Sequence, residues 1–210
     1  ASQTVQNYAA NAFKTAGMSA NEYMETVTGF SASLIQSLGG DTAKAAEVAD
    51  MAITDMADNA NKMGTDLSAI QTAYQGFAKQ NYTMLDNLKL GYGGTKSEME
   101  RLLADAEKIS GIKYDLSSFS DLTEAIHVIQ TEMGITGTTA KEATETISGS
   151  MAGMQSAIDN LMAGLGNADA DIEMLIGNVV EAFGHVVDNV VPVIENIVKA
   201  LPPALDGILR

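Results

Sequence analysis

The fold class is decided by residues 40–64, which read GDTAKAAEVADMAITDMADNANKMG. Asp41 can cap the amino end of a helix with its side chain, and Gly64 can end that helix in the left-handed backbone conformation. Between them, apolar side chains recur every three or four residues and share one helical face: Ala45, Ala49, Ala52, Met56, Ala60 and Met63. The pattern predicts an α-helix over residues 42–63. Because most of this face is alanine, we expect its partner helices to lie close.

The same helix signals recur on both sides of this stretch. Three capping boxes, in which Ser or Thr is followed three residues later by Glu, begin at Ser19, Thr95 and Thr139. Together with glycine stops they predict helices over residues 20–38, 66–79, 96–110, 121–133 and 140–165, and a short helix over 84–90. No alternating run is long enough for a sheet. We therefore expect an all-α fold: a bundle of about six to eight short helices with glycine-terminated connections, followed by a strongly apolar carboxyl-terminal helix.

The carboxyl-terminal stretch differs from the rest of the chain. Within residues 172–201 the polar side chains keep to one line: Asn178, Glu181, His185, Asp188, Glu195 and Lys199. The remaining apolar arc is wider than the ~100° stripe of a helix that covers one core. It therefore requires partners on more than one side, from the domain core, other copies of the chain or lipid. We predict an oligomer interface through Val179, Phe183, Val186, Val190, Val193 and Ile197.

The prolines and the change in composition set the expected boundaries. Pro192 predicts a kink or a new helix start within the apolar stretch, and Pro202 with Pro203 predicts its end. We expect two domains, a helical core over residues 1–166 and an apolar helical segment over residues 167–210.

Composition excludes several classes of function. The 210 residues carry a net charge of −15, which disfavours nonspecific binding to nucleic acid and to anionic membrane surfaces. Without cysteine there is no disulfide framework and no thiol catalysis. Five Phe, six Tyr and no Trp leave the core to small and aliphatic residues and to the 12 Met, which is typical of closely packed helices.

Three motifs resemble functional sites without meeting their requirements. Residues 90–97, LGYGGTKS, approach a phosphate-binding loop, but Leu90 and Thr95 replace its two required glycines. In residues 167–173, acidic or amide side chains occupy every second position, as at the start of a calcium loop, yet Ile172 replaces the required glycine. His127 and His185 each have acids one helical turn away and no second ligand at metal spacing. We expect a glycine turn, helix-terminal acids and paired or solvated histidines, with no catalytic residue, metal site or cofactor.

Most of the chain, about residues 11–165, resembles the core region of tail tape measure proteins of tailed phages. The most distinctive segments are QGFAKQNYTMLDNLKLGYGGTKSEMERLL at residues 75–103 and GITGTTAKEA at residues 134–143. The resemblance implies a virion structural protein that lies in the tail lumen or tail tip, sets tail length during assembly in the host cytoplasm, and helps deliver the genome into the host. It also implies a small number of copies, with tail-tube, tail-tip or baseplate and tail-assembly chaperone proteins as partners. No catalytic residues accompany this region.

The chain departs from the family in length. Tape measure proteins are much longer than 210 residues, and as one helix this chain would span only about 315 Å. We expect a folded helical domain that belongs to a longer ruler. Three alternatives stay open. The first is a membrane-interacting or pore-forming role for residues 172–201, with the host membrane as a further partner. The second is a cytoplasmic helical scaffold unrelated to phage, and the third is an enzyme such as a peptidoglycan hydrolase, for which no carboxylate pair or metal site can be named.

Overall fold

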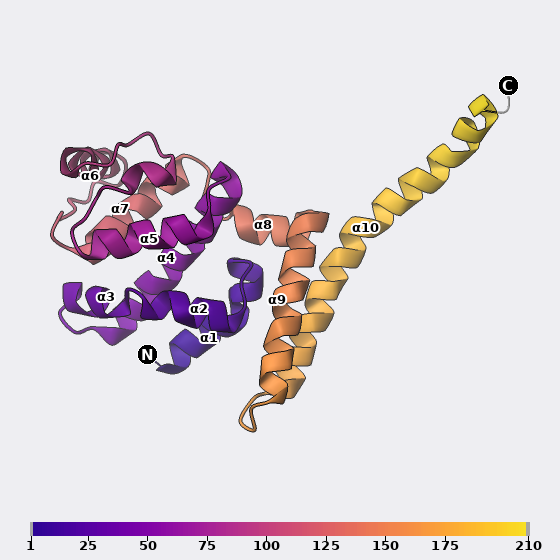
Figure 1. The fold of residues 1–210 in the computed structure, drawn as a ribbon, viewed down its shortest axis with the longest axis horizontal. Coiled ribbons are helices and arrows are strands. Elements are labelled where there is room, and N and C mark those ends of the chain that lie inside the picture. Colours follow the sequence, from indigo (N-terminus) through magenta and orange to yellow (C-terminus); the bar gives the residue numbers. More distant parts are fainter. Residues whose placement is uncertain (1, 209–210) are drawn as a thin grey trace. The chain divides into compact units, whose positions relative to one another are not determined.

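The computed structural model describes the backbone of residues 2–208 and the side chains of residues 2–200. Within this range the chain is helical and contains no strand, which confirms the all-α prediction. In chain order the helices are α1 (Ser2–Thr15), α2 (Ala20–Thr28), α3 (Ser31–Ser37), α4 (Thr42–Met63), α5 (Leu67–Ala78), the 3₁₀ helix η1 (Leu85–Leu88), α6 (Lys96–Ser110), α7 (Phe119–Glu132), α8 (Thr138–Glu145), α9 (Ile147–Leu165) and α10 (Ile172–Ile208) (Figure 1).

The chain divides into two compact units, residues 1–140 and residues 141–210. This division falls earlier in the chain than residue 166, where we placed the boundary from composition. The physical reason is that α9 packs along α10, so it belongs to the same compact unit as the apolar helix.

Helix α4 is the centre of the first unit. It packs against α1, α2, α3, α5 and α7, while α6 packs on α7. The predicted face is buried at Ala45, Ala49, Ala52 and Met56 and half-buried at Ala60 and Met63. The helix also buries side chains outside that face: Ala46, Val48, Ile53, Asp55, Ala57, Asp58 and Asn59. A helix surrounded on so many sides needs small residues, which explains its alanine content.

The capping signals are partly confirmed. Ser19 and Glu22 form a complete capping box, and Asp41 caps α4, which ends at a left-handed Gly64 as predicted. Thr95 caps α6 by accepting from the Glu98 N–H at 3.2 Å. The predicted helices over 96–110 and 42–63 match α6 and α4 at both ends.

Two helices that we predicted as continuous are each broken. The helix over 20–38 divides into α2 and α3 at Gly29 and Phe30. Phe30 is buried and meets the edge of the Phe119 ring at 6.1 Å between centroids, so burial of this side chain turns the backbone out of the helix. The remaining difference at the amino end is α1, which we did not predict.

The helix predicted over 140–165 divides into α8 and α9, and Thr139 is not its cap. Thr139 lies within α8 with its hydroxyl buried and without a hydrogen-bond partner. Thr146 caps α9 instead, accepting from the Gly149 N–H at 3.0 Å. The turn is too tight for a larger residue, because a Cβ at Gly149 would lie 2.4 Å from the Glu142 carbonyl oxygen. Two additional breaks and α1 together explain why the described chain has more helices than expected.

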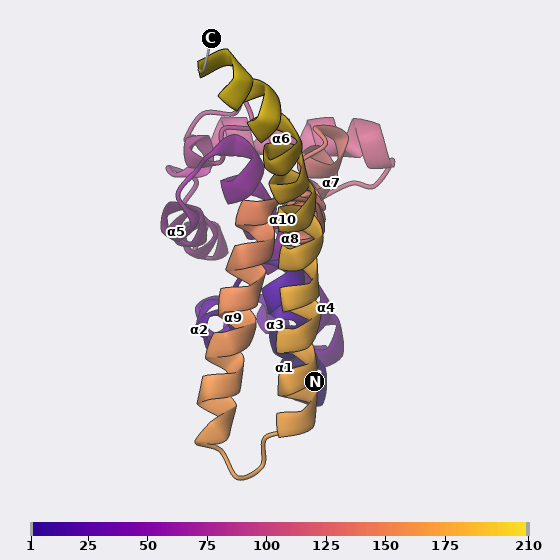
Figure 2. The same ribbon diagram turned by 90° about the vertical axis from the view of Figure 1, so that its right-hand side faces the viewer.

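In the second unit, α9 and α10 form an antiparallel hairpin (Figures 1 and 2). Helix α10 does not restart at Pro192 and continues past Pro202 and Pro203 to Ile208, so the predicted end is wrong. Proline removes one N–H from the helix and displaces one carbonyl, and on an exposed helix water can satisfy that carbonyl. Figure 1 shows α10 bending near the level at which α9 begins. Asn189 lies at that level, because its side chain donates to the carbonyls of Thr144 and Thr146.

Candidate functional site: the exposed face of α10

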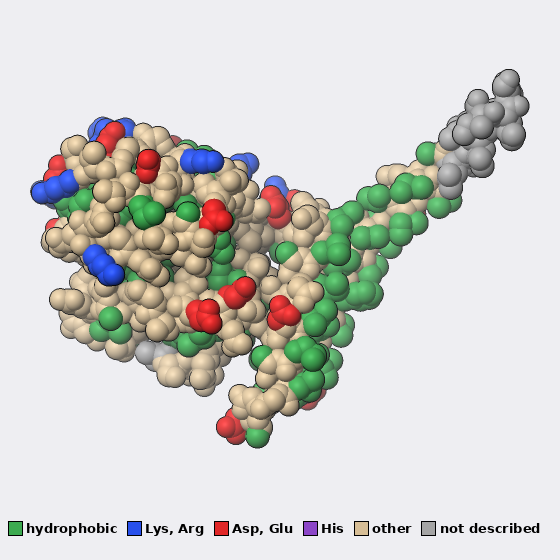
Figure 3. Space-filling model, viewed as in Figure 1, with side chains coloured by type: hydrophobic (Ala, Val, Ile, Leu, Met, Phe, Trp, Pro, Cys, Tyr) green, Lys and Arg blue, Asp and Glu red, His purple; other side chains and the backbone are tan. Residues whose placement is uncertain are grey.

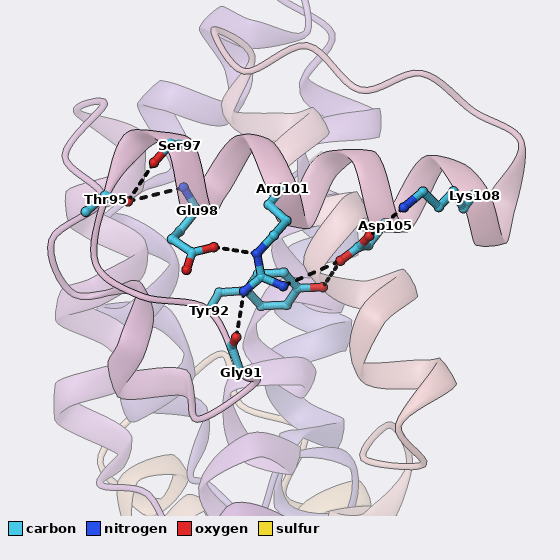
Figure 4. Close-up of polar contacts among 8 residues, drawn as sticks. All are labelled: Gly91, Tyr92, Thr95, Ser97, Glu98, Arg101, Asp105 and Lys108. Atoms are coloured by element: carbon cyan, nitrogen blue, oxygen red, sulfur yellow. Dashed lines mark hydrogen bonds and ion pairs between the residues drawn. The ribbon is translucent and has the colours of Figure 1, made fainter.

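The glycine-rich loop before α6 is a packed turn (Figure 4). Arg101 stacks on the Tyr92 ring, 4.3 Å from its centroid, and donates to the Gly91 carbonyl at 2.8 Å. The Tyr92 hydroxyl donates to Asp105 at 2.8 Å, and burial together with this contact raises the pKa of Tyr92 to about 12. Gly94 lies so close to the backbone of Thr83 that a Cβ would stand 2.2 Å from its carbonyl oxygen. These contacts confirm the turn that leads into the Thr95 cap and explain its glycine and arginine.

His127 pairs with an acid from another helix. Its Nδ1 lies 3.0 Å from each carboxylate oxygen of Asp55, whereas we predicted that it is solvated or paired one turn away on its own helix. Burial raises the pKa of Asp55 to about 6, although the hydrogen bond from His127 opposes this shift. The same hydrogen bond raises the pKa of His127 above its usual value. The pair joins α4 to α7 and belongs to the framework of the first unit.

Two further buried residues extend this polar contact. The Asn59 side chain donates to the Leu88 carbonyl at 2.9 Å and to Gln130 Oε1 at 2.7 Å. The Asp58 carboxylate accepts from the N–H groups of Gly137 and Thr139 at 2.7 and 2.9 Å, and it thereby caps α8 from the middle of α4. Sequence reasoning missed these residues, because polar residues in an alanine-rich helix resemble its solvated face.

The segment that resembles a calcium loop, residues 167–173, forms the turn before α10 and the first residues of that helix. Asp171 accepts from the Met174 N–H at 2.9 Å, and Asn167 accepts from the Asp169 N–H at 3.0 Å. The Asp171 contact is the helix-terminal role that we predicted. Across the part of the chain that the structure describes, no group of three or more His, Asp or Glu side chains could hold a metal ion. His185 is half-buried on α10, on the same polar line as Glu181 and Asp188.

One side of α10 packs against α9. The buried positions of α9 are small: Ser150, Gly153, Ser156, Ala157, Asn160 and Gly164. They allow close approach, and a Cβ at Gly164 would stand 2.3 Å from Leu175 Cδ1. On α10, six of the buried or half-buried residues follow the three-and-four spacing of a packed helical pair. We call this set the inner seam: Ile172, Leu175, Val179, Ala182, Val186 and Asn189.

A second apolar line on α10 lies one residue further along the chain. It has the same spacing, and we call it the outer seam: Ile176, Val180, Phe183, Val187, Val190, Ile194 and Ile197. Apart from half-buried Val190, its members are exposed, from 38% at Val187 to 65% at Val180. Figure 3 shows hydrophobic side chains running along this helix. Soluble monomers rarely expose a continuous apolar surface of this kind.

The residues predicted as an oligomer interface fall on both seams. Val179 and Val186 belong to the inner seam and are half-buried, while Phe183, Val190 and Ile197 belong to the outer seam; Val193 is exposed beside it. Ile176, Val180, Val187 and Ile194 complete the outer seam and were not among the residues predicted as an interface. Their repeat was visible in the sequence, but nothing there indicated which of two adjacent seams α9 would cover.

Among the described residues, one helix, Ile172–Ala200, is long and apolar enough to cross a membrane by length and composition. Comparison of the chain with protein families, with curated protein sequences and with solved structures gives no match.

Proposed function

We propose that this chain is a structural and assembly module of a phage tail, a helical segment of a tape measure protein that associates with other copies of itself. In this proposal it resides in the tail lumen or tip, takes part in length determination and genome delivery, and contacts tail-tube, tail-tip and chaperone proteins. It acts by binding and assembling, not as an enzyme.

The observation that carries the proposal is the resemblance over residues 75–103 and 134–143. In the structure these segments contain residues with specific structural tasks. Arg101 and Tyr92 fix the loop before α6, and Gly137 and Thr139 receive the Asp58 cap. The exposed outer seam also supports an assembly role, since a module that builds a larger structure needs an uncovered apolar surface.

A membrane-interacting role is the second candidate, and one observation favours it. The outer seam is exposed on a helix long enough to span a bilayer. The polar line opposes this role, because Glu181, Asp188 and Glu195 would lie at bilayer depth and the line lacks the cluster of basic residues that favours anionic lipid. Leakage of a dye from neutral and anionic vesicles tests this candidate.

The proposed function is tested in the phage genome that encodes the chain. A stop codon at Gln75 should abolish tails of normal length in electron micrographs of lysates, and a synonymous change at the same codon should leave them unchanged. Mass spectrometry of wild-type virions should detect peptides of this chain. Tails of normal length with the stop codon, or a reading frame that lies outside any set of tail genes, would contradict the proposal.

A further inference from the structure

The outer seam has the repeat of a coiled-coil interface. From Ile176 to Ile197 its members alternate steps of four and three residues over three heptads. This repeat lets side chains of one helix insert between those of a partner helix, which is knobs-into-holes packing. The line contains no charged residue, whereas Glu181, Asp188 and Glu195 follow a different line on the same helix. Because every copy of the chain carries the same seam, two copies can present it to each other.

The flank of the outer seam differs between its two halves. Every second residue of the outer seam is followed directly by a small or apolar residue that flanks the seam on one side. These flanking residues are Gly177 and Gly184 in the first half of the seam and Val191 and Val198 in the second half. The space where a Cβ would stand at either glycine is open, with no atom within 4 Å. Val191 and Val198 are exposed, at 43% and 58%. One half of the flank is therefore hollow and the other half protrudes.

The geometry points to an antiparallel pair, in which α10 lies along α10 of a second copy through the outer seam. A two-fold axis near Val187 and Val190 places each half of one helix against the opposite half of the other. The protruding valines of one copy then fill the space above the glycines of its partner. In a parallel pair this flank would instead face the opposite flank of the partner, which includes the half-buried Val179 and Val186 of the inner seam, so the hollow and the protruding halves would not meet.

The available surface is sufficient for such a pair. The exposed fractions of the outer seam, 38–65%, and of the two flanking valines correspond to roughly 600–900 Å² per copy if each residue offers roughly 150–220 Å². A stable interface buries about 800 Å² per partner. The new surface also lies directly beside the inner seam, so the pair would continue the packing that α9 and α10 already form.

This inference deepens the self-association included in the proposed function, but its test needs only the purified chain and no phage tail. The sequence contains no cysteine, so introduced cysteines report contacts without background. A two-fold axis near Val187 and Val190 brings position 180 of one copy to position 197 of the other. We would prepare V180C, I197C and the polar-line control D188C in the full chain, with an affinity tag on one partner of each mixture.

Under mild oxidation, the mixture of V180C and I197C should give at least a tenfold higher yield of cross-linked dimer than either variant alone, and D188C should give none. Efficient self-cross-linking of V180C and of I197C would show a parallel pair and overturn the proposal. A chain that stays monomeric and cross-links in no mixture would also overturn it, and its binding to phosphatidylcholine vesicles would then identify lipid as the occupant of the outer seam.

Discussion

Removal of the Asn59 side chain should destabilise the first unit more than any other single truncation of a neutral polar residue in α4. This residue is fully buried and makes three hydrogen bonds. Its amide donates to the Leu88 carbonyl at 2.9 Å and to Gln130 Oε1 at 2.7 Å, and its oxygen accepts from the Thr65 hydroxyl at 2.8 Å. These contacts tie α4 to η1, to α7 and to the turn before α5.

The magnitude follows from the groups that Asn59→Ala leaves without a partner. The Leu88 carbonyl and Gln130 Oε1 stay buried, and each unpaired group costs about 1–3 kcal/mol. Thr65 is half-buried, so its hydroxyl can turn toward water. Alanine regains about 0.5 kcal/mol of helix propensity. The expected loss in free energy of unfolding is therefore about 3 kcal/mol.

Tyrosine fluorescence during urea unfolding measures this loss in the first unit alone, because all six tyrosines lie between Tyr8 and Tyr114. Asn61→Ala is the matched control: the residue is exposed on the same helix, and its replacement should change stability by no more than about 0.5 kcal/mol. If Asn59→Ala and Asn61→Ala unfold at the same urea concentration, the buried polar contacts do not stabilise the fold as argued.

Two further perturbations test the first unit. The raised pKa values of Asp55, about 6, and of His127 mean that the folded state binds protons more tightly than the unfolded chain, so the urea midpoint should rise as the pH falls from 8 to 5.5. His127→Gln should remove the contribution of the imidazole and leave that of Asp55, and a wild-type midpoint that decreases as the pH is lowered through this range contradicts the assignment. Gly94→Ala should lower the free energy of unfolding by more than about 2 kcal/mol, because the added Cβ would meet the Thr83 backbone. Gly93→Ala is the matched control and should be tolerated, because the nearest atom to its Cβ would be 3.5 Å away. Equal effects of the two substitutions in thermal unfolding would refute this explanation.

The helix content was predictable because its signals are local. Asp41 and Gly64 mark the two ends of α4, and Thr95 marks the start of α6, by contacts made within a few residues. The breaks were not predictable in this way. The turn at Phe30 depends on Phe119, and the start of α8 depends on Asp58, 79 residues before Gly137. Tertiary contacts of this length leave no periodic trace in the sequence.

The candidate surface was partly predictable. The width of the apolar arc after residue 172 correctly indicated that one helix carries more apolar surface than a single partner covers. The division of that arc into an inner and an outer seam depends on the small residues of α9, such as Gly153 and Gly164, which determine where α10 can approach. The two seams are offset by one residue along α10, so only the packing of α9 against α10 in the structure shows which of them α9 covers.

The central claim, that a second copy covers the outer seam, is tested most directly by sedimentation equilibrium of the full chain across the micromolar range. We predict a monomer–dimer equilibrium that Val180→Glu shifts to monomer, while Glu181→Gln, its neighbour on the polar line, leaves the dimer intact. A wild-type chain that sediments as a monomer at every concentration, or a dimer that Val180→Glu does not weaken, would contradict the claim.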